Sequence, residues 1–582
     1  MQHKQCHRRD RNQHSGSLGH FGRQGMAKQD AGSEGPSLDS LAEAESSAEG
    51  VGRLFGADGP FATAMRSFDP AAMMQQSMDL SRSMFQIAMG TSEIAPDKRD
   101  WRFKDDAWTS NPFYHRISQA YLAMSDAVEA MIPEDLNWED KARAQLAASI
   151  VTSSFAPTNT LLGNPAAINK TIETGGSNLV KGFKAFLDDL QNNGGMPRQV
   201  DATPFEVGRN MAVTPGKIVL RTEMFELIHY KPSTDQVHAL PVLLVPPQIG
   251  RYYFTDLTPG RSFAEYVVSQ GLQYFAISWR NPSPDERAFG MEGYVAAVIE
   301  AMEAIMAITA QPKVNMVGFC AGGITTAITA ACLAAKGRDL VNSFTLCVAM
   351  IDFDNDASLG AFRLPAMLTV AKAQSSMKGV LPGSDLSKIF AWLRPNDLIW
   401  NYWVNNYLMG EEPAPFDILA WNNDSSNMAA QLHKDFLNIF DNNLLIEPGA
   451  YEVLGAPVDL SEVTCDMFIV GAVTDHLTPW KACYKSARLI GGERTFALSN
   501  GGHVAALVNP PGNPKAYHFI APAAPEDADQ WLESAEKLTG SWWESWTKWC
   551  GARSGDLVSA PKALGSKKFI PLMDAPGEYV KQ

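Results

Sequence analysis

Paired cysteines are missing from this 582-residue sequence. Its seven cysteines are scattered and odd in number, and no two of them form a CxxC pair. The sequence therefore indicates neither a disulfide framework nor a zinc site built on thiolates, and this usage is typical of a reducing compartment. The first residues carry charge, but no apolar stretch follows them, so no secretory signal is predicted.

An excess of basic residues is missing too. The chain has 49 lysines and arginines against 64 aspartates and glutamates, a formal net charge of −15. Binding to nucleic acids or anionic membranes needs a basic face that neutralises phosphates, so neither partner is expected. A charge-free stretch of membrane-spanning length, 314–335, contains an asparagine, three glycines and three threonines and begins like a strand. We therefore predict no transmembrane segment.

Hydrophobic residues make up 45% of the chain and charged residues 19%, so most of it can bury a core. Residues 1–50 are the exception, because they are rich in Gly, Ser, Gln, His and acidic residues and hold almost no aliphatic side chains. We predict a disordered tail there, since burial cannot offset its ordering entropy. Met26 is a second possible start, and we hypothesise that translation begins there rather than at Met1; intact mass of the native protein tests this.

Residues 51–205 carry helical patterns and are expected to form a helical N-terminal domain, with the longest run over 112–190. Before that run, apolar residues recur at spacings of four, seven and four, as in an amphipathic helix: Met74, Met78, Phe85 and Met89. The simpler interpretation of this stripe is packing within its own domain. The alternative is a soft docking surface, since methionine adapts to varied partners.

From residue 206 onward, β-branched runs alternate with helical patterns such as 293–308 and 324–335. The predicted strands are 218–229, 242–245, 273–278, 314–318, 343–351, 467–473 and 494–498. This alternation predicts an α/β domain over 206–582, with a mainly parallel sheet covered on both faces. Residues 353–445 interrupt the rhythm. They are rich in Trp, Tyr, Asn and Pro, contain no clear strand, and are expected to form an inserted cap.

The motif Gly318-Phe-Cys320-Ala321-Gly322 lies between a predicted strand and a predicted helix. It has the form of the nucleophile elbow G-x-S-x-G of α/β hydrolases, with cysteine in the serine position. The glycines are needed because the turn is too tight for side chains. Cys320 is then at a helix N-terminus, whose free N–H groups favour a thiolate. We predict an α/β-hydrolase-like fold in which Cys320 is the nucleophile and the Ala321 N–H donates to the oxyanion.

In α/β hydrolases the nucleophile of the elbow is followed along the chain by the acid and then by the histidine of the catalytic triad. Asp475 and His503 follow in that order, each just past a predicted strand, where open α/β sheets place their sites. The second oxyanion N–H is expected from the loop after strand 242–245, near Gln248.

Other residues compete for these roles. His476 is adjacent to the proposed acid, so its side chain points elsewhere, and His433 in the cap is expected to be a surface or core residue. Asp352 follows the strand 343–351 and is either an alternative acid or a cap of a turn. Four further cysteines have apolar surroundings and are expected to be inert packing residues: Cys332, Cys347, Cys465 and Cys483.

Three tryptophans near the end of the chain fall at i, i+4 and i+7 and so share one helical face: Trp542, Trp546 and Trp549. The first interpretation is that this face packs on the sheet, and the second is that it contacts a partner.

Long segments of the sequence resemble the poly(3-hydroxyalkanoate) synthases, specifically the single-subunit, class I-like kind of similar length, over roughly residues 100–582. The matching segments begin with VPPQIGRYYFTDLTPGRSF, ISWRNP, GFCAGG and LRPNDLIWNYWVNNYLMG, and continue with FDILAWNNDSSN, TDHLTPW, GGHVAALVNPP, GSWW and APGEYVKQ. By this resemblance Cys320, Asp475 and His503 match the catalytic triad of the family.

The resemblance implies an acyltransferase that polymerises (R)-3-hydroxyacyl-CoA, with the short-chain 3-hydroxybutyryl-CoA as the expected substrate, and releases CoA. It implies no cofactor, because CoA belongs to the substrate. It further implies a homodimer at the surface of cytoplasmic polymer inclusions, with granule-associated proteins as further partners. Cysteine suits this reaction because acylation exchanges one thioester for another, which leaves the acyl group activated for attack by the next hydroxyl.

Some questions stay open on the residues alone. Asp475 either orients His503 or assists deprotonation of the substrate hydroxyl, and we expect Asp475→Asn to slow chain extension more than the first acylation. Four tryptophans of the cap are expected to exclude water from the site: Trp392, Trp400, Trp403 and Trp421. One rival function is an acyl-CoA thioesterase or dienelactone-type hydrolase with the same triad, and another is a non-enzymatic interaction protein on an inactive hydrolase scaffold.

Overall fold

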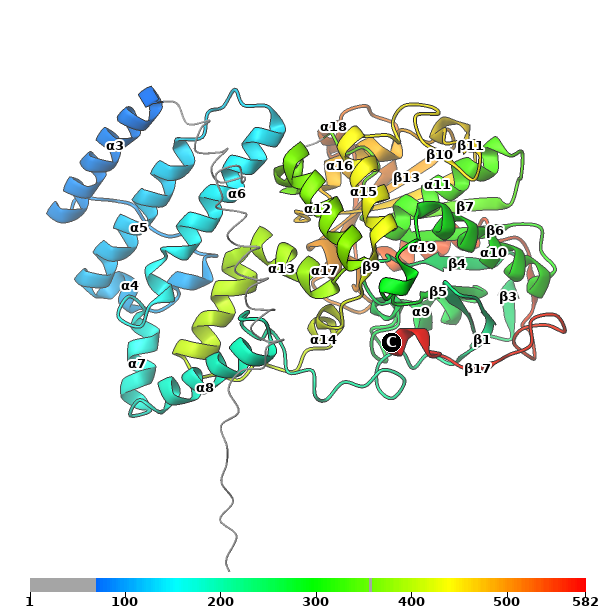
Figure 1. The fold of residues 1–582 in the computed structure, drawn as a ribbon, viewed down its shortest axis with the longest axis horizontal. Helices are drawn as coiled ribbons and strands as arrows, with labels where there is room; N and C mark the ends of the chain where they lie inside the picture. The colour runs from blue at the N-terminus through cyan, green and yellow to red at the C-terminus, as the bar shows by residue number, and fades with distance from the viewer. Residues whose placement is uncertain (1–69, 355–357) are drawn as a thin grey trace, which may run out of the picture.

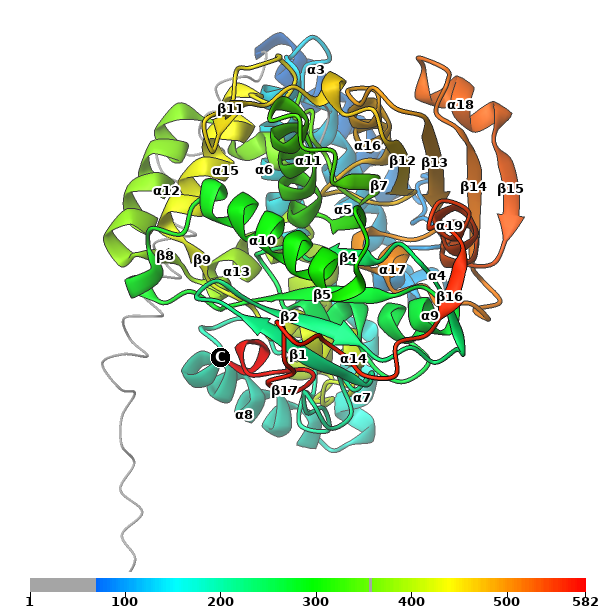
Figure 2. The same cartoon turned by 90° about the vertical axis from the view of Figure 1, so that its right-hand side faces the viewer.

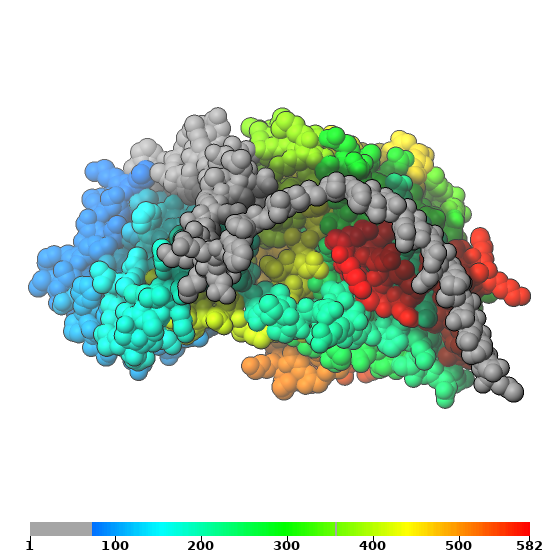
Figure 3. All heavy atoms as spheres, turned by 60° about the horizontal axis from the view of Figure 1, so that its bottom comes forward, coloured from blue at the N-terminus to red at the C-terminus, as the bar shows by residue number. Residues whose placement is uncertain are grey.

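The computed structural model describes residues 70–354 and 358–582. The predicted tail, 1–50, and the choice between Met1 and Met26 lie outside the described residues. The molecule is elongated, with a bundle of N-terminal helices at one end and a large sheet with its covering helices at the other (Figure 1). Figure 3 shows the same two-part shape from below, with the C-terminal segment on the surface of the sheet-containing part.

The N-terminal part is helical, as predicted. Two of its long helices begin at asparagine N-caps. The Asn111 side chain accepts a hydrogen bond from the N–H of Phe113 (2.9 Å), and the Asn137 side chain accepts one from the N–H of Asp140 (2.8 Å). The helices are α3 (Pro70–Met89), α4 (Ala107–Ser110), α5 (Pro112–Ala130), α6 (Trp138–Ser154), α7 (Pro165–Glu173) and α8 (Ser177–Asn192).

The methionine-rich stripe lies on α3, and its four side chains face solvent. Met74 is 68% exposed and Phe85 67% exposed, whereas Ile87 on the same helix is 4% exposed. The packing interpretation of the stripe is therefore wrong, since Ile87, which lies outside the stripe, is the one buried residue among residues 73–89. The docking-surface interpretation stays a prediction.

The sheet-containing part is built on eleven strands in the order β15-β14-β13-β12-β7-β6-β4-β5-β2-β1-β17. The central six, from β13 to β5, are parallel, as predicted, and the strands at both edges are antiparallel. The bounds are β1 (Gly216–Arg221), β2 (Phe225–Tyr230), β4 (Val242–Val245), β5 (Tyr274–Trp279), β6 (Val314–Phe319), β7 (Val341–Cys347), β12 (Asp466–Ala472), β13 (Arg494–Ser499), β14 (Tyr517–Pro522), β15 (Glu536–Thr539) and β17 (Met573–Asp574).

Two predicted strands differ from the structure by more than two residues. The single strand predicted over 218–229 is a hairpin of β1 and β2, because the Thr222 hydroxyl accepts hydrogen bonds from the N–H groups of Met224 and Phe225 (both 3.2 Å) and closes a turn. The strand predicted to reach residue 351 ends at Cys347. There the chain turns through Val348, whose φ of 44° is incompatible with a strand.

Helices cover both faces of the sheet (Figure 2). Along β4 the side chains alternate between two buried clusters, with Leu243 facing α10 (Met291–Thr309) and α11 (Ala321–Ala335), and Leu244 facing α9 (Phe263–Ser269) and α19 (Trp542–Gly551). Trp542 and Trp546 are fully buried in the second cluster, which confirms that the tryptophan face packs on the sheet. The remaining helices of this part are α16 (Trp480–Ala487), α17 (His503–Leu507) and α18 (Ala528–Ser534).

The segment between β7 and β12 forms the cap, although these two strands are neighbours in the sheet. Its helices are α12 (Pro365–Lys378), α13 (Gly383–Leu393), the π-helical turns η6 (Asn396–Trp400) and η7 (Trp403–Leu408), α14 (Asp417–Asn423) and α15 (Ala430–Asn442). It also contains two pairs of two-residue strands that the sequence analysis did not predict: β8 (Val380–Leu381) with β9 (Met428–Ala429), and β10 (Glu452–Val453) with β11 (Ala456–Pro457).

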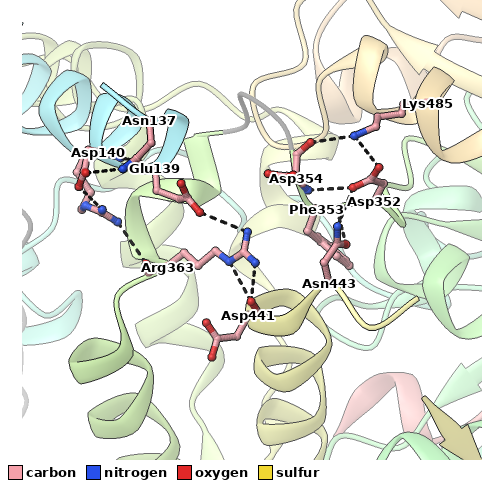
Figure 4. A network of polar contacts seen from close by, with 11 residues as sticks. Asn137, Glu139, Asp140, Asp352, Phe353, Asp354, Arg363, Asp441, Asn443 and Lys485 are labelled. Atoms are coloured by element: carbon pink, nitrogen blue, oxygen red, sulfur yellow. Dashed lines mark hydrogen bonds and ion pairs between the residues drawn. The ribbon is translucent and has the colours of Figure 1, made fainter. Parts of the chain in front are cut away.

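Arg363 joins the helical part to the cap (Figure 4). Its guanidinium donates to the carbonyl of Asp441 at the end of α15 (3.1 and 2.5 Å) and lies 3.5 Å from the Glu139 carboxylate of α6. It also lies over the rings of Trp138 and Phe440. Among helices within 70–354 and 358–582, none is both long and apolar enough to cross a membrane.

Candidate active site

Cys320 occupies a tight turn between β6 and α11. Its backbone has a φ of 50° and a ψ of −123°, and its N–H donates to the carbonyl of Cys347 on the neighbouring strand (2.9 Å). A Cβ at Gly318 would lie 2.5 Å from the Thr326 hydroxyl, and one at Gly322 would lie 2.3 Å from the Val245 carbonyl oxygen. The two glycines are therefore required by the close approach of β4 and α11 on either side of the cysteine, which agrees with the predicted elbow.

The other two predicted triad residues meet at the same edge of the sheet. Asp475 follows β12 and His503 begins α17, just past β13. The His503 Nδ1 lies 2.7 Å from the Asp475 Oδ2. Because Nδ1 is engaged in this way, the other ring nitrogen of His503 remains for Cys320, whose hydrogen bond contributes to the environment of the histidine.

His503 titrates far from its ordinary range. Burial alone would lower its pKa, but the charge of Asp475, the charge of Cys320 and hydrogen bonds to both raise the pKa to about 10. Burial would likewise raise the pKa of Asp475, but the charge of His503 and several hydrogen bonds hold it below its usual value. The surroundings thus favour a carboxylate beside an imidazolium at neutral pH.

Thr478 is a part of the site that the sequence analysis missed. Its hydroxyl lies 2.8 Å from Asp475 Oδ2, 3.1 Å from the Val348 carbonyl oxygen and 3.3 Å from His503 Nδ1. The N–H groups of Leu477 and Thr478 donate to Asp475 Oδ1 (2.9 and 3.0 Å). A threonine three residues after the acid was the available signal, because Asp side chains often accept from the N–H groups two and three residues on.

The two predicted oxyanion donors come from different elements. Ala321 is the first residue of α11, and the first N–H groups of a helix have no intrahelical acceptor. Gln248 lies in the loop after β4 and is 4% exposed. Its side-chain amide donates to the hydroxyl of Thr325 on α11 (2.9 Å), so the loop is tied to the helix that follows Cys320.

The competing residues have other roles. Asp352 is paired with Lys485 (2.8 Å) and accepts from the Asn443 amide (2.9 Å), on the network of Figure 4, so it is not the acid partner of His503. His433 is a buried residue whose Nδ1 lies 2.9 Å from the Ser375 hydroxyl, and burial lowers its pKa to about 4. His476 is half-buried, and burial together with Arg394 lowers its pKa to about 4.

The other cysteines agree with the prediction of inert packing. Cys332, Cys347 and Cys483 are buried, and burial raises the pKa of each thiol. Cys465 is partly exposed, yet burial raises the pKa of its thiol to about 12. These surroundings favour neutral thiols, which are poor nucleophiles.

Three of the four cap tryptophans pack against the helical part, and their exclusion of water from the site stays a prediction. Trp403 donates to the Asn159 carbonyl (3.1 Å) in the helical part and packs beside Trp400, whose indole nitrogen has no hydrogen-bond partner. Trp392 packs on the cluster around Leu146 of α6. These rings fill the contact between cap and helical part. Trp421, by contrast, packs on Phe254 in the cluster that Cys320 adjoins.

The helix that begins at His503 is held from behind by α19. The indole N–H of Trp542 donates to the carbonyl of Ala506 (2.7 Å), and that of Trp543 donates to the carbonyl of Leu507 (3.1 Å). These two carbonyls belong to the last turn of α17 and would otherwise be unsatisfied inside the protein. The described residues contain no group of three or more His, Cys, Asp or Glu side chains placed to hold a metal ion.

Comparison with known proteins gives two family matches. Residues 99–267 match the family described as Poly-beta-hydroxybutyrate polymerase (PhaC) N-terminus, and residues 241–510 match the alpha/beta hydrolase fold. Poly(3-hydroxyalkanoate) polymerase 1 of Ectopseudomonas oleovorans is 46% identical over 85% of this chain and 89% of its own length. Poly(3-hydroxyalkanoate) polymerase subunit PhaC of Cupriavidus necator is 37% identical over 86% of each chain.

Proposed function

The chain belongs to the poly(3-hydroxyalkanoate) polymerase family and is an acyltransferase, and from this premise we propose that it polymerises (R)-3-hydroxyacyl-CoA through a thioester on Cys320. The observation that carries the proposal is the meeting of Cys320, His503 and Asp475 at the carboxyl edge of the parallel strands. We propose short acyl chains, such as 3-hydroxybutyryl, as the substrate.

At the start of the cycle His503 already holds the proton of the Cys320 thiol, because its surroundings favour the imidazolium at neutral pH. The sulfur attacks the thioester carbonyl of the substrate, and the N–H groups of Ala321 and Gln248 donate to the oxyanion. The carbon–sulfur bond to CoA then breaks, and His503 returns the proton to the departing CoA sulfur. CoA enters as part of the substrate and leaves as a product, so the cycle as written uses no further cofactor.

In the second half, the 3-hydroxyl of a further hydroxyacyl unit attacks the thioester on Cys320. His503, left neutral when it gave its proton to CoA, accepts the hydroxyl proton, a new ester bond forms, and the Cys320 sulfur leaves as a thiolate beside the imidazolium. The acyl chain is thereby one unit longer. Water competes with this hydroxyl, so a dry site separates polymerisation from hydrolysis.

The hydrogen bonds of Asp475 support an orienting role. Its side chain is fully buried, Oδ1 accepts two backbone N–H groups, and Oδ2 accepts from His503 while it also contacts the Thr478 hydroxyl. No lone pair is left for a substrate hydroxyl. We therefore propose that Asp475 acts through His503 in both halves of the cycle. Asp475→Asn is then expected to slow acylation and chain extension by similar factors in single-turnover assays, contrary to the split expected from the sequence.

The test of function is incubation with 3-hydroxybutyryl-CoA and with a longer-chain analogue, while CoA release and polymer are followed together. We expect both to appear with the short substrate and to vanish in Cys320→Ala. The matched control is Cys465→Ala, which removes another partly exposed thiol and should stay active. Free hydroxy acid without polymer would favour the thioesterase alternative, and unchanged turnover in Cys320→Ala would remove the triad from the mechanism.

The assembly and location of the protein are also part of the proposal. We propose a homodimer at the surface of polymer inclusions, because the growing polyester stays attached to the enzyme between additions. Sedimentation of the protein without substrate measures whether it is a dimer. Sedimentation during synthesis measures its association with polymer.

A further inference from the structure

One short segment of the cap is seated directly on the loop that carries Gln248. The indole N–H of Trp421 donates to the carbonyl of Arg251 (2.8 Å), and Gly250 pairs with Ser425 in an isolated antiparallel bridge. The Tyr253 hydroxyl donates to the Asp424 carboxylate (2.9 Å). Residues 421–425 therefore form a seat for residues 250–253, through main-chain and side-chain hydrogen bonds together.

The seat also depends on shape. A Cβ at Gly250 would lie 3.1 Å from Cζ2 of Trp421, so the glycine lets the indole ring lie close against the loop. The ring also packs against Phe254, with the ring centroids 5.2 Å apart. The indole is thus held by two packing contacts in addition to the hydrogen bond from its N–H to the Arg251 carbonyl.

The same loop is fixed at its other end by the nucleophile helix. Gln248, three residues before Arg251, is bound to Thr325 of α11. Arg251 itself is 7% exposed, and its guanidinium lies 3.4 Å from Asp424 and donates to the carbonyl of Tyr579 (3.3 Å). The position of the Gln248 N–H is therefore set by two anchors, one on α11 and one on the cap.

We propose that Trp421 is a positioning residue for acyl transfer, because its hydrogen bond to Arg251 holds the loop in which the Gln248 N–H points at the oxyanion. This inference rests on the proposed function. Oxyanion donors act only when they are placed within a few tenths of an ångström of the developing charge, so a loop freed at one anchor loses transition-state binding more than substrate binding.

The test compares two identical exchanges in the cap. Trp421→Phe keeps an aromatic ring against Phe254 and Gly250 but removes the indole donor, whereas Trp400→Phe removes an indole N–H that has no partner. We expect Trp421→Phe to lower kcat for 3-hydroxybutyryl-CoA about tenfold with KM changed less than twofold, and Trp400→Phe to retain activity.

A second measurement separates positioning from general damage. Alkylation of Cys320 by iodoacetamide forms no oxyanion, so its rate should be unchanged in Trp421→Phe while acylation by the thioester slows. Equal loss of alkylation and acylation, or acylation at the wild-type rate, would overturn the inference. If Trp421→Phe does not fold, Asp424→Asn provides the test, because it weakens the same contact between residues 421–425 and 250–253. We expect Asp424→Asn to lower kcat by a smaller factor, again with the alkylation rate unchanged.

The outcome for wild-type protein distinguishes this inference from its premise. If wild-type protein forms no acyl group on Cys320, the proposed function fails. If wild-type protein is acylated and Trp421→Phe matches it, only the positioning role fails.

Discussion

The hydroxyl group of Thr478 makes three polar contacts in the site. It lies beside the Asp475 carboxylate, the Val348 carbonyl and the ring of His503. The Val348 carbonyl is presented by a backbone with positive φ, which a β-branched residue rarely adopts. The threonine thus ties the acid to the strained end of β7, and the site depends on a residue that does not touch the substrate in the proposed cycle.

Thr478→Val tests this dependence, because it keeps the side-chain shape and removes the hydroxyl. A buried polar group left without its partner costs about 1–3 kcal/mol, so we expect kcat to fall about 5- to 150-fold. Thr329→Val on α11 is the control, since that buried hydroxyl only bonds back to the carbonyl of Thr325 (2.7 Å). A wild-type kcat in Thr478→Val would show that the Thr478 hydroxyl is not needed to position the Asp475 carboxylate.

The raised pKa of His503 makes stability depend on pH. In the unfolded chain a histidine titrates near 6.5, and in the folded protein the pKa of His503 is about 10. The native state therefore favours the protonated ring. The resulting stabilisation is complete below pH 6.5, declines as the pH rises, and is lost above about pH 10.

Asp475→Asn should remove this contribution, because the carboxylate is the main group that raises the pKa against the effect of burial. We expect the difference in free energy of unfolding between wild type and Asp475→Asn to narrow from pH 6.5 to pH 10, as measured by urea unfolding at several pH values. Asp556→Asn, an exposed position, is the control. A difference that stays constant over this range would show that His503 is not protonated in the folded state.

At the scale of elements, α17 is a five-residue helix that could not be stable alone. Its position is imposed by α19, whose two indole N–H groups satisfy its last carbonyls. The tryptophan face thus packs on the sheet and at the same time fixes the element that presents His503.

Trp542→Phe should therefore affect both stability and catalysis. Loss of the donor leaves the Ala506 carbonyl unsatisfied, and we expect a destabilisation of about 1–3 kcal/mol with a fall in kcat. Trp549→Phe, on the same helix, is the matched control because its ring is only partly buried. Thermal unfolding and CoA-release kinetics measure both effects, and equal behaviour of the two variants would contradict the role of the hydrogen bond.

The sequence was sufficient for those parts of the fold that local rules determine. The elbow around Cys320 was predictable because close packing leaves glycine as the only choice at two fixed spacings. The hairpin of β1 and β2 was not, because its turn is closed by the Thr222 hydroxyl without a glycine or proline. The packing partners of the cap tryptophans were not predictable, because composition indicates that a ring is buried but not which surface it meets.

At the scale of the whole molecule, Arg363 is one link between the helical part and the cap. It is 17% exposed, and it contacts a carbonyl at the end of α15, a carboxylate of α6 and two aromatic rings. A partly buried cation of this kind is destabilising when its partners are removed. The orientation of the cap on the helices thus depends on a few closely spaced groups.

Arg363→Met should loosen this contact while the sheet stays intact. We expect faster amide hydrogen exchange in α6 and at the end of α15, with exchange in β6 unchanged. Arg338→Met is the control, since it removes a surface pair with Glu303 (2.6 Å) that contributes little. Uniformly faster exchange, with β6 included, would mean that Arg363 supports the whole fold instead of one contact.

The polypeptide leaves the sheet after β7 and re-enters it at the adjacent position, β12. An insertion with such neighbouring exit and entry points can be lengthened, trimmed or transplanted between homologues without any change of strand registry. The cap can therefore diverge in evolution, or be exchanged in chimeras, while the sheet beneath it keeps its strand order.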